Sequence, residues 1–165
     1  MRHFTLVVFV ALFWLSAGSA TAQSPAQLCV AKMESGPGAN AGQELLLKFL
    51  DKEKDKSVAQ ELPLDSSEPA QALEEAKKAH CDYLVTTKQT ESHQENSIMT
   101  GSFGNVSTPT FYVATAYKLT RVSDGSEVLS GNLKASDHSS EQTAIGLTMH
   151  KVADKVTEAI KKGGH

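Results

Sequence analysis

Hydrophobic and polar positions follow two different periods along this chain. Alternating or short apolar runs, which are typical of strands, lie at 28–33, 57–64, 81–91, 110–122 and 127–135. Apolar residues recur at helical spacing at 41–54, at about 69–80 and at 139–162. The pattern therefore predicts a chain in which strands and helices are interspersed.

The order of these segments is β-α-β-α-β-β-β-α. Alternating strands and helices in the first half indicate parallel strands joined by crossovers. The turn Ser123-Asp124-Gly125-Ser126 separates two strands and predicts an antiparallel hairpin. We expect a single α/β domain with about five strands in a mixed sheet and three helices. The last helix should be capped by Ser139, which has capping-box spacing to Gln142.

Residues 92–109 are rich in Ser, Thr, Asn and Gly and predict one long flexible loop. Phe103 lies in it between two glycines and is a candidate apolar contact for a partner. Asn105 begins the sequon Asn-Val-Ser, which is glycosylated only in a host that modifies such sites. The alternative is a plain connection between two strands.

Residues 1–22 have the organisation of a secretory signal peptide. A basic start precedes the apolar run 4–15, and small residues follow, ending in Ala20-Thr21-Ala22. The apolar run is too short to span a bilayer. We expect cleavage between Ala22 and Gln23, an exported chain that is periplasmic or secreted, a domain over 23–165 and no stable membrane insertion.

The charge balance narrows the class of partner. The chain has 16 Lys and Arg against 19 Asp and Glu, a formal net charge of −3. A nucleic-acid-binding domain usually carries a basic stripe, and docking to anionic lipid also needs positive charge. We therefore expect neither nucleic acid nor an anionic membrane as the partner.

Two segments resemble a known family of envelope domains. The run Ala76-Lys77-Lys78-Ala79-His80-Cys81-Asp82-Tyr83-Leu84-Val85 is similar to the A-D-Y-[VL]-[VL] pattern at the start of a strand, and 117–128 is similar to that family's long strand and turn. With the strand, loop and helix at 28–50, the chain resembles the TolB amino-terminal domain, CsgG and LpoB-type lipoproteins. The resemblance implies a non-enzymatic envelope module that works through contacts with another envelope protein.

Cys29 and Cys81 are the two cysteines of the chain. Lipidation of Cys29 would require small residues directly before it, whereas Leu28 precedes it. In sheets of the resembled type the strands that carry Cys29 and Cys81 are parallel neighbours, so both cysteines fall at one end. We expect a disulfide, which suits an exported protein. The alternative is two buried thiols.

Other candidate chemistry has simpler explanations. His80 beside Cys81 could be part of a metal site, but no typical ligand spacing is present, and His93, His138, His150 and His165 are scattered. Asp137-His138-Ser139 contains the residue types of a hydrolase triad, yet triad members come from separate segments, so turn and cap roles are expected.

The loop 36–42 is glycine-rich and follows a strand. It lacks the Lys-Ser/Thr ending of a phosphate-binding loop, so a turn before a helix explains it. We expect no catalytic residue, no metal and no cofactor.

These observations favour an exported, non-catalytic protein-interaction or assembly module. Its contacts would come from 92–109 and from a sheet edge near 57–64, where Pro63 is typical of an edge strand. The alternatives are a secreted binder of a small ligand, held near 36–40, and a hydrolase whose site the sequence does not reveal.

Overall fold

The computed structural model describes residues 26–34, 39–52, 60–101 and 104–163. These residues form the predicted α/β domain, with the elements in the predicted order. The strands are β1 (Leu28–Val30), β2 (Glu61–Pro63), β3 (Tyr83–Gly101), β4 (Gly104–Arg121) and β5 (Glu127–Asp137). The helices are α1 (Ala39–Lys52), α2 (Pro69–Lys78) and α3 (Glu141–Gly163).

The strands form one five-stranded mixed sheet in the order β2-β1-β3-β4-β5. β1 pairs in parallel with β2 and β3, whereas β4 is antiparallel to both β3 and β5. As predicted, the alternating first half of the chain gives parallel strands and the Asp-Gly turn gives a hairpin. β2 is an edge strand, as Pro63 indicated.

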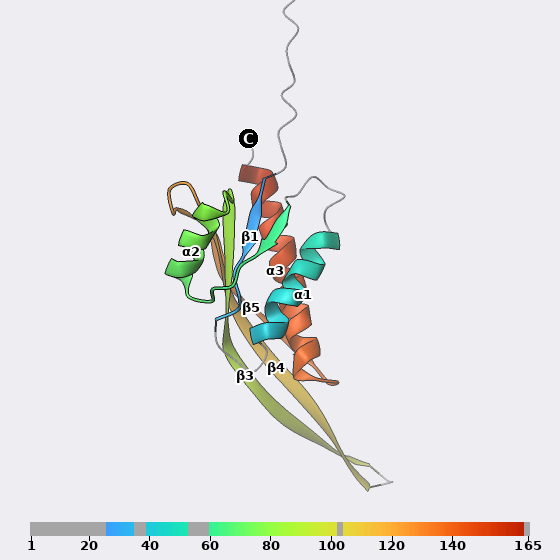
Figure 1. Cartoon of the computed structure of the whole chain (residues 1–165). Helices are drawn as coiled ribbons and strands as arrows, with labels where there is room; N and C mark the ends of the chain where they lie inside the picture. The colour runs from blue at the N-terminus through green and yellow to red at the C-terminus, as the bar shows by residue number, and fades with distance from the viewer. Residues whose placement is uncertain (1–25, 35–38, 53–59, 102–103, 164–165) are drawn as a thin grey trace, which may run out of the picture.

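The helices cover the two faces of the sheet unequally. α1 and α3 lie side by side on one face, and the shorter α2 lies on the other (Figure 1). The larger core is on the α1–α3 side and contains fully buried Leu46, Leu119, Ile145, Met149 and Val152. Burial of this apolar area is the main force that holds the long α3 on the sheet.

The smaller core lies under α2 and contains the disulfide. Cys29 and Cys81 are bonded, with their Cα atoms 5.9 Å apart, and Ala72 and Ala76 of α2 pack beside them. The pairing is the one expected from the sequence. It rests on the predicted neighbourhood of the two strands, because Cys29 lies in β1 and Cys81 lies just before β3.

Two close approaches fix α1 against the sheet. The Gln43 amide donates hydrogen bonds of 2.8 Å to the carbonyls of Val30 and Leu64, and so ties the helix to β1 and to the end of β2. Gly42 faces Met33, whose sulfur would lie 2.8 Å from a Cβ at that position. Gly42 is therefore a helix residue with a packing role, rather than the end of a loop.

The start of α3 differs from the predicted cap. The hydroxyl of Ser140, not that of Ser139, accepts a hydrogen bond of 3.0 Å from the amide of Thr143. Ser139 instead belongs to the preceding turn, where its amide donates to the Asp137 carboxylate at 2.7 Å. The shift by one residue follows because Asp137 competes successfully for Ser139.

Candidate interaction surface

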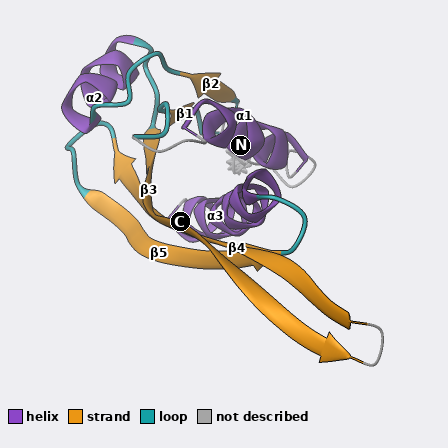
Figure 2. Cartoon of the chain, turned by 90° about the horizontal axis from the view of Figure 1, so that it is seen from below, coloured by secondary structure: helices purple, strands orange, loops and turns teal. Residues whose placement is uncertain are grey.

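The most prominent feature of the molecule is a two-stranded arm. The pairing of β4 with β5 ends at Phe111, which lies opposite Asp137. From there to the turn between β3 and β4, these two strands pair only with each other. This arm comprises Glu95–Gly101 of β3 and Gly104–Thr110 of β4, and it extends well past the body of the domain (Figures 1 and 2). Figure 2 shows that it points away from both α1 and α3.

The arm corrects the prediction of a loop at 92–109. Residues 92–101 and 104–109 are strand residues in continuous antiparallel register, from Ser92 opposite Val113 to Gly101 opposite Gly104. The sequence pattern was misleading because a ribbon exposed on both faces needs no apolar alternation, and Ser, Thr and Asn satisfy an exposed strand. Backbone hydrogen bonds between β3 and β4 form the ribbon, although the side-chain pattern does not predict strands there.

The two faces of the arm differ in chemistry. Residues that pair across antiparallel strands share a face, so Ser92, Gln94, Asn96 and Ile98 lie on the face of Val113, toward α1 and α3. This face, the helix-side face, carries no ionisable residue in the described part of the arm and its base. Glu91, His93 and Glu95 all lie on the opposite face.

Hydrogen bonds clamp both strands of the arm base to the connection between β5 and α3. On β3, the Gln89 amide donates at 3.2 Å to Oε1 of Glu141, and the Ser92 hydroxyl donates to the same oxygen. On β4, the Thr110 hydroxyl lies 3.0 Å from Nδ1 of His138. The direction of the arm is therefore fixed by the start of α3.

The charged face is internally paired. The His93 ring stacks on Tyr112 with centroids 4.9 Å apart, and its nitrogens lie 3.2 Å from Glu91 and 3.4 Å from Glu95. Lys134 of β5 also reaches Glu91, at 3.1 Å. Glu91 is thus paired with Lys134, and the His93 ring lies between Glu91 and Glu95, so both carboxylates are already engaged within this face.

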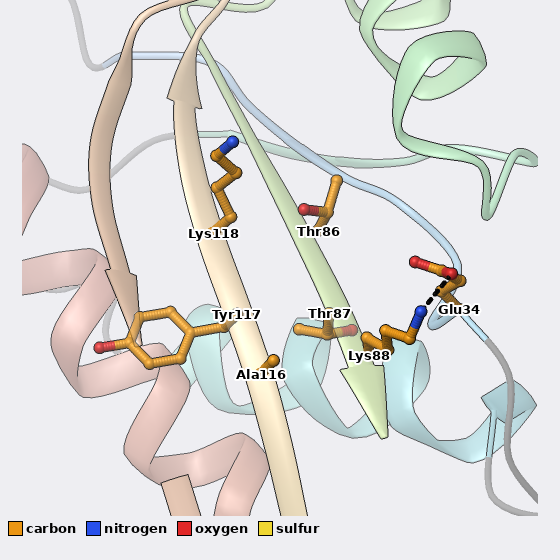
Figure 3. A pocket seen from close by; sticks show the side chains of 7 residues that line it. All are labelled: Glu34, Thr86, Thr87, Lys88, Ala116, Tyr117 and Lys118. Carbon is orange, nitrogen blue, oxygen red and sulfur yellow. Dashed lines mark hydrogen bonds and ion pairs between the residues drawn. The ribbon is translucent and has the colours of Figure 1, made fainter. Parts of the chain in front are cut away.

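The described residues contain two hollows of interest. A small cavity of about 160 Å³ lies beside β3, where Glu34 forms an isolated parallel bridge to Lys88, and the two side chains form an ion pair of 2.8 Å (Figure 3). A larger groove of about 450 Å³ lies between α1 and α3. We call it the α1–α3 groove, and its lining comprises Leu45, Phe49, Ser140, Gln142, Thr143, Gly146, Leu147 and His150.

The residues of the suspected triad do not form a relay. The Ser139 hydroxyl donates to Asp137 rather than to His138, and His138 contacts Thr110 and the carbonyl of Pro109. Asp137 also accepts from the amide of Ser140 at 3.3 Å. These bonds hold the pKa of Asp137 below its ordinary value, with the Ser139 hydroxyl the largest cause. Asp137 is thus the last residue of β5, and its carboxylate holds the turn that follows, where the sequence predicted a turn role.

Other predicted positions are distributed as follows. Phe103 lies outside the described residues, as do Ala22, Gln23 and residues 36–38 of the glycine-rich loop, whereas 39–42 form the start of α1. Asn105 lies in β4 opposite Thr100, next to the end of the arm. In the part of the chain that is described, no three His, Cys, Asp or Glu side chains converge as metal ligands. Nor is any helix there long and apolar enough to cross a membrane.

Sequence reasoning missed the clamp and the α1–α3 groove. Glu141, Thr110 and Gln89 are unremarkable in sequence, because their roles depend on strands that extend farther than hydrophobic patterning shows. The exposed Leu147 was the available signal for the groove: it is an apolar residue within α3 that lies off the buried row of that helix.

Comparisons with known proteins reveal a shared fold. No family model and no curated protein matches this chain. The solved PelC dodecamer from Paraburkholderia phytofirmans is 18% identical and has a TM-score of 0.53, over 78% of this chain and 86% of that one. Protein XCC0632 from Xanthomonas campestris, of family DUF330, is 14% identical with a TM-score of 0.53, over 86% and 89%.

The LpoB carboxy-terminal domain from Salmonella enterica is similar at a lower level. It is 15% identical with a TM-score of 0.44, over 70% of this chain and 86% of that one. At such identities, the PelC and XCC0632 structures show the α/β fold that this chain shares with them, and leave its function to be argued from its own surface.

Proposed function

We propose that this chain is an exported, non-catalytic envelope protein that works by protein contact, with the arm as its contact surface. The observation that carries the proposal is the clamped arm. Gln89, Ser92 and Thr110 hold its base to the start of α3, while its helix-side face presents uncharged side chains and Ile98, which is 68% exposed. A paired ribbon whose base is held in this way needs less ordering on binding than a free loop would.

The surroundings of the arm support contact rather than chemistry. The polar groups nearest to it, at Asp137, His138, Ser139 and Glu141, all bond to turns, caps or strand bases. In a catalytic site, such groups would converge on a pocket and keep donors or acceptors available for a substrate. Here Glu141 and His138 hold the base of the arm, and Asp137 and Ser139 hold the turn before α3.

The compartment is argued from two independent features. Residues 1–22 have the organisation of a signal peptide, and the Cys29–Cys81 disulfide suits an oxidising space. The sequence resemblance to TolB, CsgG and LpoB-type domains favours the cell envelope. PelC, a solved protein with this fold, is a dodecamer, so the fold is compatible with assembly through protein contacts.

The test is a shortened arm that keeps its clamps. Replacing 96–109 by Asn-Gly joins Glu95 to Thr110, which are register partners, through a two-residue turn. Ser92, Thr110 and the body of the domain remain. A photo-crosslinking residue at Ile98 should yield a discrete protein adduct in the encoding organism, whereas one at Ser97, on the opposite face, should not.

The two variants together decide the proposal. If the shortened protein folds with an unchanged melting temperature and loses its function in the envelope, the arm is the contact surface. If it retains full function, or if Ile98 and Ser97 give the same sparse adducts, the arm is not the contact surface.

A further inference from the structure

Two large apolar side chains are strongly exposed in the described part of the molecule. Ile98 on the arm is 68% exposed, and Leu147 in the α1–α3 groove is 41% exposed. They lie on different surfaces, one on a projection and the other in a hollow. Exposed apolar surface of this kind marks a site of association when it gathers in a shaped patch.

The α1–α3 groove has room for an apolar side chain. It encloses about 450 Å³ between the two helices, and Leu45, Phe49 and Leu147 supply its apolar lining. Gly146 leaves the groove open, because a Cβ there would meet only Leu45, at 4.0 Å. The missing side chain at Gly146 therefore leaves space on the surface of α3, opposite Leu45, for an apolar group of a partner.

The groove and the helix-side face of the arm also match in charge. The groove lining contains no Asp, Glu, Lys or Arg, and its one ionisable side chain is His150, whose ring packs on Phe49 with centroids 4.9 Å apart. The helix-side face carries Ser92, Gln94, Asn96 and Ile98, while the ionisable Glu91, His93 and Glu95 point to the other side. Contact between these two surfaces would bury no carboxylate of the groove lining, while the exposed ammonium of Lys52, 5.6 Å from the centroid of the Phe49 ring, would have to keep its access to water.

The arm cannot reach the groove of its own chain. Its base is held to the start of α3 by Glu141 and His138, and it runs away from the helices (Figures 1 and 2). One molecule therefore carries a projection and a matching hollow that only a second molecule can bring together. Contacts between two different surfaces of identical chains are heterologous, so each added copy exposes a new site.

We propose that the arm of one copy packs into the α1–α3 groove of the next, with Ile98 seated against Leu147 and Phe49. The inference rests on the proposed function, since it names a second copy of this chain as a partner of the arm. It assigns head-to-tail association, in which every subunit both gives an arm and receives one.

Cysteine pairs test the contact directly. The native disulfide uses both natural cysteines, so new thiols report on the interface alone. Ile98→Cys protein mixed with Leu147→Cys protein should form a mixed disulfide dimer under mild oxidation. Ser97→Cys, one residue away on the opposite face, should give at least tenfold less product with Leu147→Cys.

Charge substitutions test whether the contact drives association. Ile98→Asp and Leu147→Asp should each weaken self-association at least tenfold in sedimentation equilibrium, and Ser97→Asp should leave it unchanged. Ile98→Asp disrupts the arm and Leu147→Asp disrupts the groove. In a mixture of the two variants, the intact arm of the Leu147→Asp protein can still bind the intact groove of the Ile98→Asp protein. The mixture should therefore form a one-to-one dimer and grow no further.

Three other outcomes would overturn the inference or both proposals. A chain that stays monomeric at high concentration, and that yields no 98–147 disulfide above the Ser97 control, overturns the inference. If Ile98 still gives a discrete adduct with another protein in the envelope, the proposed function stands and only the second copy is excluded. If the arm gives no adduct at all, both proposals fail.

Discussion

The hydroxyl of Thr110 lies 3.0 Å from Nδ1 of His138, and this contact joins the arm to the turn that precedes α3. Thr110 is the last arm residue on β4, and the His138 ring also approaches the carbonyl of Pro109, at 3.3 Å. The matching contact on β3 is made by Ser92 with Glu141. The two strands are thus held separately, and each can be released by a single substitution.

Replacing His138 by Ala should loosen the arm with little effect on the body. A net hydrogen bond of this kind contributes about 0.5–1.5 kcal/mol. Amide hydrogen exchange should become faster in the arm and stay unchanged in β1 and α1. Ser136→Ala, two residues earlier and exposed on the edge strand β5, is the matched control, and equal exchange in the two variants would refute the clamp.

Loss of the disulfide should cost much of the stability of the domain. Cys29 and Cys81 are 52 residues apart in sequence, and in the chain-entropy model closing a loop of that length contributes about 4 kcal/mol. The double variant Cys29→Ala/Cys81→Ala should show that loss in urea denaturation. Mass analysis without reductant should find no free thiol in the natural protein, and a labelled thiol would contradict the bond.

Gly131 should tolerate no side chain while Tyr117 is present. A Cβ at Gly131 would lie 2.9 Å from Cε1 and 3.0 Å from the hydroxyl of Tyr117, its register partner on β4. Gly131→Ala should therefore destabilise the domain by about 1–3 kcal/mol through overpacking. In a Tyr117→Ala background the same change should cost much less, and two equal costs would show that the ring is not the obstacle.

Asp137 should make stability depend on acid pH. Hydrogen bonds from Ser139 and Ser140 lower its pKa in the folded protein, so the folded state favours the carboxylate. Its contribution is present above the ordinary pKa of an aspartate and is lost as pH falls through the lowered value. Urea denaturation from neutral to acid pH should show a shallower decline for Asp137→Asn, and parallel curves would exclude the effect.

The body of the domain was accessible from sequence because its elements bury one face. Leu46, Ile145 and Met149 recur at helical spacing, and the Asp-Gly turn defines the hairpin between β4 and β5. Parallel pairing of β1 and β3 follows from the alternation of strands and helices, and it places the disulfide.

The same physical principle explains why the arm could not be predicted from the sequence. Its strands bury neither face, so Ser92, Asn96 and Ser97 carry no periodic signal, and polar composition indicates a loop. What orders the ribbon is backbone pairing and the contacts of Gln89 and Thr110, which become visible only when distant segments are brought together.

His80 provides the last prediction, because it has a backbone conformation that favours glycine. Its φ is 57°, and it follows Ala79, the C-cap residue of α2. The amide of Cys81 donates to the carbonyl of Ala76 at 3.0 Å, and that of His80 donates to Lys77 at 3.2 Å, which is the Schellman arrangement of a helix end.

His80→Gly should therefore raise the free energy of unfolding by roughly 0.5–1 kcal/mol, since glycine adopts this conformation without a Cβ penalty. His80→Ala is the control: it removes the imidazole but keeps the Cβ, and it should bring no gain. If glycine and alanine have the same effect in urea denaturation, the backbone is unstrained there. If both destabilise the domain, the imidazole itself contributes, and the role of His80 lies in its side chain rather than in the turn.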